Sequence, residues 1–231
     1  RRIRASDAAL LAALGIDTVA VVRRPVVRIV PVGREIGDAG DLDSPMLAAL
    51  VERDGGIADR RPAGPDGADA LHGLLARPGA DLILVNAVDP NALLPAVRRA
   101  KAAGITVVAV DVTAAGVDAT VQTDNVKAGA IACDYMIDKI GGKGNVIIQN
   151  GPQVSAVIDR VKGCKEELAK HPEVKLLSSD QDAKGSRDGG LNVMQALLTR
   201  FSDVQGVFAI NDPQAIGSDL AARQLNRTGI V

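Results

Sequence analysis

Aromatic residues are almost absent from this chain of 231 residues. Tyr135, Phe201 and Phe208 are the only ones, and there is no tryptophan. Sites that stack nucleobases on aromatic rings, and protein interfaces anchored by such rings, are therefore largely excluded. The formal net charge is −1, from 27 Lys and Arg against 28 Asp and Glu. Such a balance gives no electrostatic signature for nucleic acid or an anionic membrane, so we expect no nucleic-acid partner.

Long apolar runs are also missing. No stretch approaches 18 uninterrupted apolar residues, so no membrane span is expected. Asp7 and Asp17 break the apolar stretch near the start, and we therefore expect no signal peptide in this chain. The sequence has no initiator Met and closes on Ile230 and Val231, which resemble the beginning of a strand. These features predict a fragment at both ends, truncated at the C-terminus before the last strands.

Cysteine and histidine each occur only twice. His72, His171 and the two cysteines lack the spacing of metal ligands, so we expect no metal site and two surface histidines. Cys133 and Cys164 each lie on the apolar stripe of a predicted helix. Two buried thiols are the simpler expectation. A disulfide between the two helices is the alternative if the protein is exported.

Motifs for catalysis are absent as well. There is no G-x-S-x-G elbow, and no histidine stands near a serine or cysteine at a strand end. The glycine cluster 141–144 follows a helix and precedes a strand, which is the reverse of a phosphate-binding loop. The glycines after residue 32 do not form G-x-G-x-x-G. We therefore expect a protein that is not an enzyme and has no cofactor.

What the sequence does contain is a repeated alternation of short apolar strands and amphipathic helices. This order is typical of parallel α/β sheets covered on both faces. The expected strands are Val26–Val32, Leu82–Val85, Ile105–Val110, Val146–Ile148, Val174–Leu177 and Val207–Ile210. A short helix at Ser6–Leu14 and a strand at Thr18–Val22 precede them.

The alternation divides the chain into two lobes. Residues 113–123 are rich in Ala, Gly, Thr and Val and have no helical period, which favours a hinge. The expected division is an N-terminal extension 1–23, a first α/β lobe 24–112, the hinge 113–123 and a second, incomplete α/β lobe 124–231.

Polar residues follow the carboxyl ends of the strands, where open α/β sheets bind ligands. Carboxylates and amides in such places suit a small polyhydroxylated ligand, because each hydroxyl needs a donor and an acceptor. Some of these residues are expected to cap helices, above all Asp89 before Pro90 and Asp212 before Pro213. The candidate ligand-binding residues are Asp89, Asp111, Gln153, Ser155 and Asn211.

From about residue 80 onward the chain resembles a known family. The matching stretches include Gly79–Asn86, Asp89–Leu93, Thr123–Asn125, Gly142–Val146, Asp159–Gly163, Gly190–Met194 and Asn211–Ala215. They resemble the periplasmic sugar-binding proteins of the ribose-binding type, the solute receptors of ABC importers. The resemblance implies two Rossmann-like lobes of periplasmic binding protein type I, which close over a monosaccharide without catalysis. It also implies a periplasmic location and the membrane subunits of an ABC importer as partners.

Position by position, the resemblance assigns sugar contacts to Asp111 and Asn211. Three ligand positions of the ribose pattern are changed here, where the chain has Val112, Ile158 and Gly185. Gly185 stands where the family has an aromatic ring that stacks on the sugar. A sugar other than ribose is therefore expected. In this family the C-terminal part supplies further ligand residues and completes the first lobe, so the expected truncation also predicts weak sugar binding, in the millimolar range or below detection.

Residues 1–84 differ in composition, with eleven Arg and no Lys. The stretches Ala9–Ile16, Arg24–Val30 and Asp43–Leu50 resemble the molybdopterin molybdenumtransferase family. The two resemblances meet near residues 82–86, which suggests a chimera or fusion. The alternative function is therefore that of a molybdopterin-binding enzyme fragment in molybdenum-cofactor biosynthesis. A hybrid with neither activity also remains open.

Overall fold

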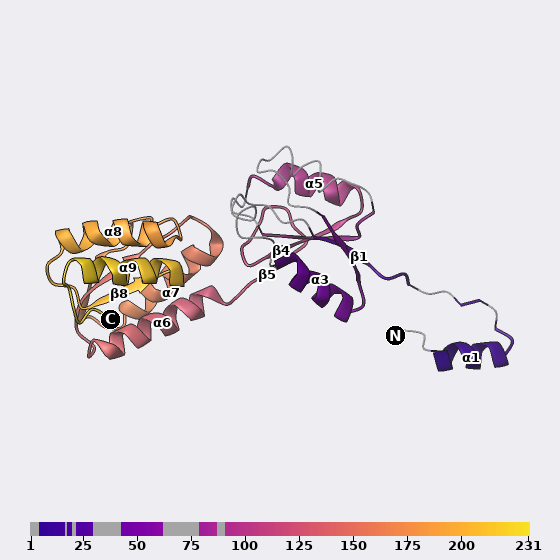
Figure 1. Cartoon of the computed structure of the whole chain (residues 1–231), viewed down its shortest axis with the longest axis horizontal. Helices are drawn as coiled ribbons and strands as arrows, with labels where there is room; N and C mark the ends of the chain where they lie inside the picture. Colours follow the sequence, from indigo (N-terminus) through magenta and orange to yellow (C-terminus); the bar gives the residue numbers. More distant parts are fainter. Residues whose placement is uncertain (1–4, 17, 20–21, 30–42, 62–78, 87–90) are drawn as a thin grey trace.

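The computed structural model of the chain describes residues 5–16, 18–19, 22–29, 43–61, 79–86 and 91–231. Two α/β lobes contain most of these residues, and helix α1 (Ala5–Ala13) lies apart from both (Figure 1). Strand β5 (Ala119–Val121) belongs to the first lobe, and helix α6 (Asn125–Lys139) begins the second. The α/β class expected from the sequence is confirmed.

The first lobe contains a five-stranded parallel sheet in the order β2-β1-β3-β4-β5. Figure 1 shows α3 and α5 on opposite sides of this sheet. Buried aliphatic side chains of β3, α5 and β4, such as Ile83, Val97 and Val107, form its core. The elements are β1 (Val26–Ile29), α3 (Asp43–Arg53), β2 (Ile57–Arg60), β3 (Leu82–Val85), α5 (Leu94–Ala102), β4 (Thr106–Val110) and β5.

The second lobe contains a three-stranded parallel sheet in the order β7-β6-β8. Val146 and Ile148 of β6 pack against α6 and α7, whereas Ile147 faces α8 and α9. This alternation follows from the two-residue period of a strand, and it makes β6 apolar on both faces. After α6 the elements are β6 (Gly144–Gln149), α7 (Ser155–Leu168), β7 (Val174–Ser178), α8 (Arg187–Arg200), β8 (Gly206–Ala209) and α9 (Asp212–Gln224).

Helices α6 and α7 cross closely because glycines stand at the contact. A Cβ atom at Gly163 would lie 1.9 Å from the main-chain oxygen of Val126. The same helices are joined by a disulfide between Cys133 and Cys164, both fully buried. The simpler expectation of two free thiols is therefore wrong, and the disulfide alternative holds.

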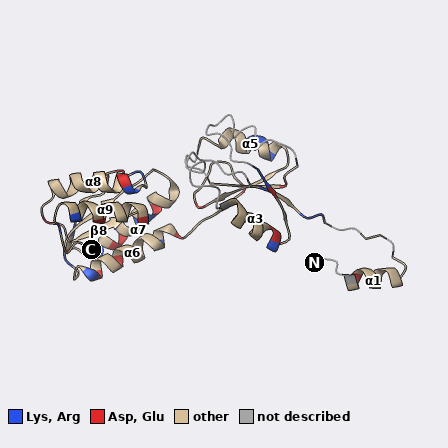
Figure 2. Cartoon of the chain, viewed as in Figure 1, with Lys and Arg blue, Asp and Glu red and all other residues tan. Residues whose placement is uncertain are grey.

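Several boundaries differ from the sequence expectation. Strands β2 and β5 were not predicted, and β5 falls within the segment 113–123. No strand forms at the described residues Thr18, Val19 and Val22. Helix α5 begins at Leu94 with Leu93 as its N-cap, and the cap predicted at Asp89 lies outside the described residues. Among the described helices, none has both the length and the apolar character to cross a membrane. Figure 2 shows basic (blue) and acidic (red) positions along the ribbon of both lobes.

Candidate ligand-binding site

The carboxyl ends of β6 and β8 define the candidate site of the second lobe. These strands are neighbours, and β7 lies on the other side of β6, so the sheet order reverses between them. Such reversals leave a crevice beyond the strand ends in open α/β sheets. The segment 150–153 follows β6 there, and Asn211 follows β8.

Asn211 occupies the N-cap of α9. Its Oδ1 accepts a hydrogen bond from the main-chain N–H of Gln214 at 3.1 Å, and its Nδ2 donates to the Gly185 carbonyl at 3.0 Å. The cap predicted at Asp212 is therefore wrong, because Asp212 is already the first helical residue. Asn211 combines the extended backbone and the short polar side chain that a cap requires.

The loop before α8 brings Gly185 to this position. A Cβ at Gly185 would lie 3.4 Å from Asn211 Nδ2 and 3.8 Å from Pro152 Cδ. Gly185 and its neighbour Lys184 both have positive φ, 66° and 58°. The tight turn thus places the main chain, with no side chain, beside Asn211 and the loop after β6.

A buried pair of amides supports the site from behind. Gln149 and Gln214 are fully buried, and sequence reasoning did not single out either of them. Gln214 Nε2 donates to the carbonyls of Gln149 and Asn150 at 3.2 and 3.1 Å, and its Oε1 accepts from Gly185 N–H at 2.7 Å. Gln149 Nε2 donates to the Gly190 carbonyl at 2.9 Å. The network ties the loop after β6, the loop before α8 and the start of α9 together.

Gln153 lies in the loop that follows β6. Its side chain is exposed, and its Nε2 donates to the Gly151 carbonyl at 3.1 Å. Asn150 and Gln153 also line one end of a surface groove of about 490 Å³ that continues along α7 to Ala169. Ile158, at a position where the ribose-type pattern has an arginine, is half exposed and lines the same groove.

Ser155 connects the two lobes. Its Oγ accepts from the main-chain N–H of Thr113 at 2.9 Å and donates to Gln122 Oε1 at 3.4 Å. Val154 and Ala156 pack into the core of the first lobe beside Val112. The hydroxyl of Ser155 is therefore engaged by the connection between the lobes.

Asp111 lies two residues before Thr113, at the end of β4. Its side chain is exposed, and its main-chain N–H donates to the Val121 carbonyl at 2.9 Å. Its backbone has φ 70°, a conformation that aspartate tolerates better than most residues. Asp89 lies outside the described residues. Gln153 thus follows Pro152, which lies beside Gly185 and Asn211, and Asp111 is two residues from Thr113, the partner of Ser155.

Charged side chains near the site form hydrogen bonds with neighbouring residues. Arg160 Nη1 donates to the Ile210 carbonyl at 2.8 Å, and its Nε donates to Asn125 Oδ1 at 3.0 Å. Hydrogen bonds from Gln181 and Ser178 hold the pKa of Asp180 below its usual range. The amides of Asn150, Gln153 and Asn211 lie at the strand ends together with carboxylates such as that of Asp180, and amides suit hydrogen bonding to a neutral polar ligand.

Comparison with known proteins identifies the family of the chain. The model of the periplasmic binding protein domain matches residues 69–231. A xylitol-binding protein of Mycolicibacterium smegmatis is 38% identical over 160 residues, which are 68% of this chain and 46% of that protein. The ribose import binding protein of Escherichia coli is 37% identical over 156 residues, 66% of this chain and 52% of that protein. The chain spans about half the length of these curated relatives.

The structural likeness extends further toward the N-terminus. A periplasmic solute-binding protein of an ABC transporter from Actinobacillus succinogenes, solved with bound D-allose, matches 90% of this chain and 77% of its own. The TM-score is 0.75 at 26% identity. A match of 90% must include residues before 69, so the fold of the relatives continues into the first lobe. The chain belongs to the periplasmic binding protein domain family.

Proposed function

We propose that the chain belongs to a sugar receptor of an ABC importer, which binds a monosaccharide or sugar alcohol and does no chemistry on it. The observation that carries this proposal is the carboxyl edge of the second lobe. There Asn211, Gln153 and the main chain at Gly185 present amide donors and carbonyl acceptors around one loop cluster. The relatives named for xylitol, ribose and D-allose support this ligand class.

The lobes would hold the ligand between them. We propose lobes at 24–112 and 124–231, joined by the segment 113–123, which also adds β5 to the sheet of the first lobe. Asp111 then faces the ligand from the first lobe. Hinge closure of two lobes is a common way to enclose a small solute. A location outside the cytoplasmic membrane fits the proposal, because the disulfide between Cys133 and Cys164 requires an oxidising compartment.

A titration followed by NMR tests the proposal. Xylitol, ribose and allose would be added separately to the ¹⁵N-labelled chain, with molybdate as the comparison ligand. We expect saturable shifts of the Asn211 and Gln153 side-chain amides with a millimolar Kd. The affinity should be weak because the chain's three aromatic rings are placed elsewhere: Phe208 is buried, Tyr135 lies exposed on α6, and Phe201 ends α8. No saturable shift with any sugar would contradict the function.

Molybdopterin binding by residues 1–84 stays a prediction. The described strands of that region, β1, β2 and β3, belong to the same parallel sheet as β4 and β5. This continuity favours the sugar receptor for the first lobe too. A rise in unfolding temperature with molybdate or molybdopterin, together with no response to sugars, would favour the molybdenum-cofactor alternative instead.

A further inference from the structure

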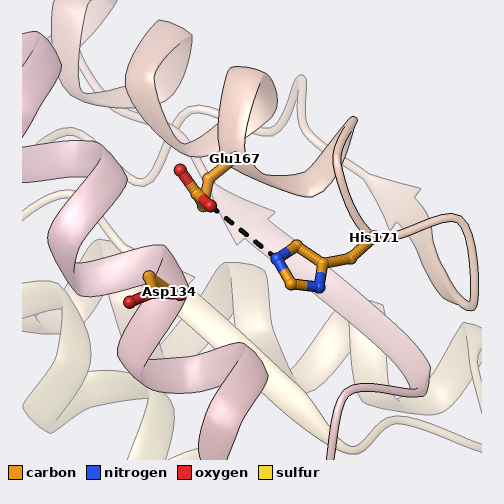
Figure 3. A group of neighbouring side chains, drawn as sticks. All are labelled: Asp134, Glu167 and His171. Atoms are coloured by element: carbon orange, nitrogen blue, oxygen red, sulfur yellow. Dashed lines mark ion pairs between the residues drawn. The ribbon is translucent and has the colours of Figure 1, made fainter.

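Three potential metal ligands meet on the second lobe, away from the candidate sugar site (Figure 3). Asp134 comes from the middle of α6, Glu167 from the last turn of α7, and His171 from the turn that leads to β7. One ligand atom from each lies within 4.8 Å of the others. Helix α7 runs back from the carboxyl edge of the sheet, so its last turn lies near the opposite edge.

Glu167 is positioned to bind a cation together with His171. Its Oε1 lies 3.7 Å from His171 Nε2, and its Oε2 accepts a hydrogen bond from Lys170 Nζ at 2.6 Å. One oxygen therefore faces the imidazole while the other is oriented by an ammonium group. A metal-binding carboxylate is commonly held in this way by a hydrogen bond to its second oxygen. The side chain of Glu167 is only 13% exposed, so its orientation is constrained by packing.

A disulfide joins the two helices that carry the carboxylates of the cluster. Cys133 precedes Asp134 directly, and its disulfide partner Cys164 is one turn before Glu167. The bridge therefore joins α6 and α7 next to the two carboxylates. Because both cysteines are bridged, no described thiol competes for a metal.

The chemistry of the three ligands decides which cation fits. Two carboxylates and one imidazole suit Zn²⁺, whereas Ca²⁺ and Mg²⁺ prefer sites made only of oxygen ligands. Ligand atoms around tetrahedral Zn²⁺ lie roughly 3.3–3.5 Å apart, as bond lengths of about 2.0–2.2 Å require. The exposed side chain of Asp134 can make the movement of about 1 Å that is still needed.

We propose that Asp134, Glu167 and His171 bind one Zn²⁺ ion, with water as a fourth ligand, and that the ion joins α6 to the turn before β7. The site is independent of the sugar function, because its residues lie in α6, the last turn of α7 and the turn before β7, whereas Asn211 and Gln153 lie at the carboxyl ends of the strands. Its effect is to stabilise the second lobe, since a metal that binds only the folded state raises the unfolding temperature.

Calorimetry with ZnCl₂ on the untagged, unreduced chain tests this proposal. We expect binding of one Zn²⁺ per chain, a Zn²⁺-dependent rise in Tm, and no response to Mg²⁺. His171→Ala and the isosteric Asp134→Asn should each weaken Zn²⁺ binding about tenfold or more. Asp138→Asn, one turn further along α6, and His72→Ala, which removes the other histidine, should leave the affinity unchanged.

The position of the ion is read separately by NMR of the histidine rings. Zn²⁺ should shift the His171 Nε2 resonance and leave that of His72 in place. Absence of binding at millimolar Zn²⁺ would overturn the proposal. So would an affinity that is the same in the parent chain, His171→Ala and Asp134→Asn, because the ion would then be bound elsewhere.

Discussion

The side-chain Oε1 of Gln214 accepts a hydrogen bond from the main-chain N–H of Gly185 at 2.7 Å, and thereby joins α9 to the loop before α8. On its other side, Gln214 Nε2 lies 3.3 Å from Gln149 Oε1, which also accepts from Ser218 Oγ at 3.0 Å. Polar groups this deeply buried cost free energy unless every donor and acceptor finds a partner. The two glutamines are therefore energetically coupled.

The coupling gives a first prediction. Gln214→Leu should lower the free energy of unfolding by about 2–3 kcal/mol, because the Gly185 N–H loses its partner and the carbonyl of Asn150 keeps only the N–H of Ala183. Gln149→Leu should cost a similar amount. The double variant should lose about 1 kcal/mol less than the sum of the two single losses. Urea unfolding of the four proteins measures this, and strict additivity would show that the glutamines act separately.

The disulfide gives a second prediction. Cys133 and Cys164 are 31 residues apart in sequence, so the bridge closes a loop of moderate length in the unfolded chain. Removing it by Cys133→Ser and Cys164→Ser together should cost about 3–4 kcal/mol on the chain-entropy relation. Unfolding with and without reducing agent provides the measurement, with the double variant as a control that reductant should not affect. Two titratable thiols in the unreduced, unfolded parent would contradict the bridge.

Much of the fold could be read from the sequence because the central strands are apolar on both faces. Leu82–Val85 was predicted with the limits that the structure shows, and Val146–Ile148 is the centre of β6. The two strands that were missed, β2 and β5, lie at the edges of the first sheet. Edge strands are short and partly exposed, so Ile57–Arg60 and Ala119–Val121 carry polar or small residues and no apolar run.

The site was less accessible to sequence reasoning. Asn211 was found because it follows an apolar strand, a position where ligand residues collect. Gln149 and Gln214 support the same loops, but they meet across 65 residues of sequence and no short motif joins them. Asp134 and His171 also come from different elements, so spacing along the chain could not indicate a metal site.

The acid stability of the first lobe gives a third prediction. The carboxylate of Asp81 accepts from Val26 N–H at 2.8 Å and pairs with Arg23, while Asp118 accepts from Val107 N–H at 2.9 Å and pairs with Lys101. Hydrogen bonds from Arg23 and Lys101, followed by those from the strand N–H groups, lower the pKa of Asp81 and Asp118. Burial raises the pKa of Asp59, but hydrogen bonds from Arg28 and Arg61 outweigh it and the net shift is downward.

A carboxyl group with a lowered folded-state pKa stabilises the fold above its unfolded pKa, and this stabilisation disappears as the pH falls through the lowered value. The first lobe should therefore lose stability below about pH 4. Asp81→Asn and Asp118→Asn should lower Tm at pH 6 and flatten its dependence on pH between about 2 and 4. Differential scanning calorimetry across this range tests it. A variant with the same pH dependence as the parent would show that its carboxylate is not involved.

Asn211 gives the last prediction, which separates its two roles. Asn211→Asp keeps an oxygen for the N–H of Gln214 but replaces the amide donor to the Gly185 carbonyl by a carboxylate. The cap survives, and a negative charge at a helix N-terminus is favourable, so stability should change by less than about 1 kcal/mol. Sugar-dependent NMR shifts should nevertheless weaken, because the donor is gone and the loop at Gly185 is repelled. Asn211→Ala loses the cap as well and should cost about 1 kcal/mol in urea unfolding. Unchanged sugar titration in both variants would mean that Asn211 serves α9 alone and that the ligand lies elsewhere on the lobe.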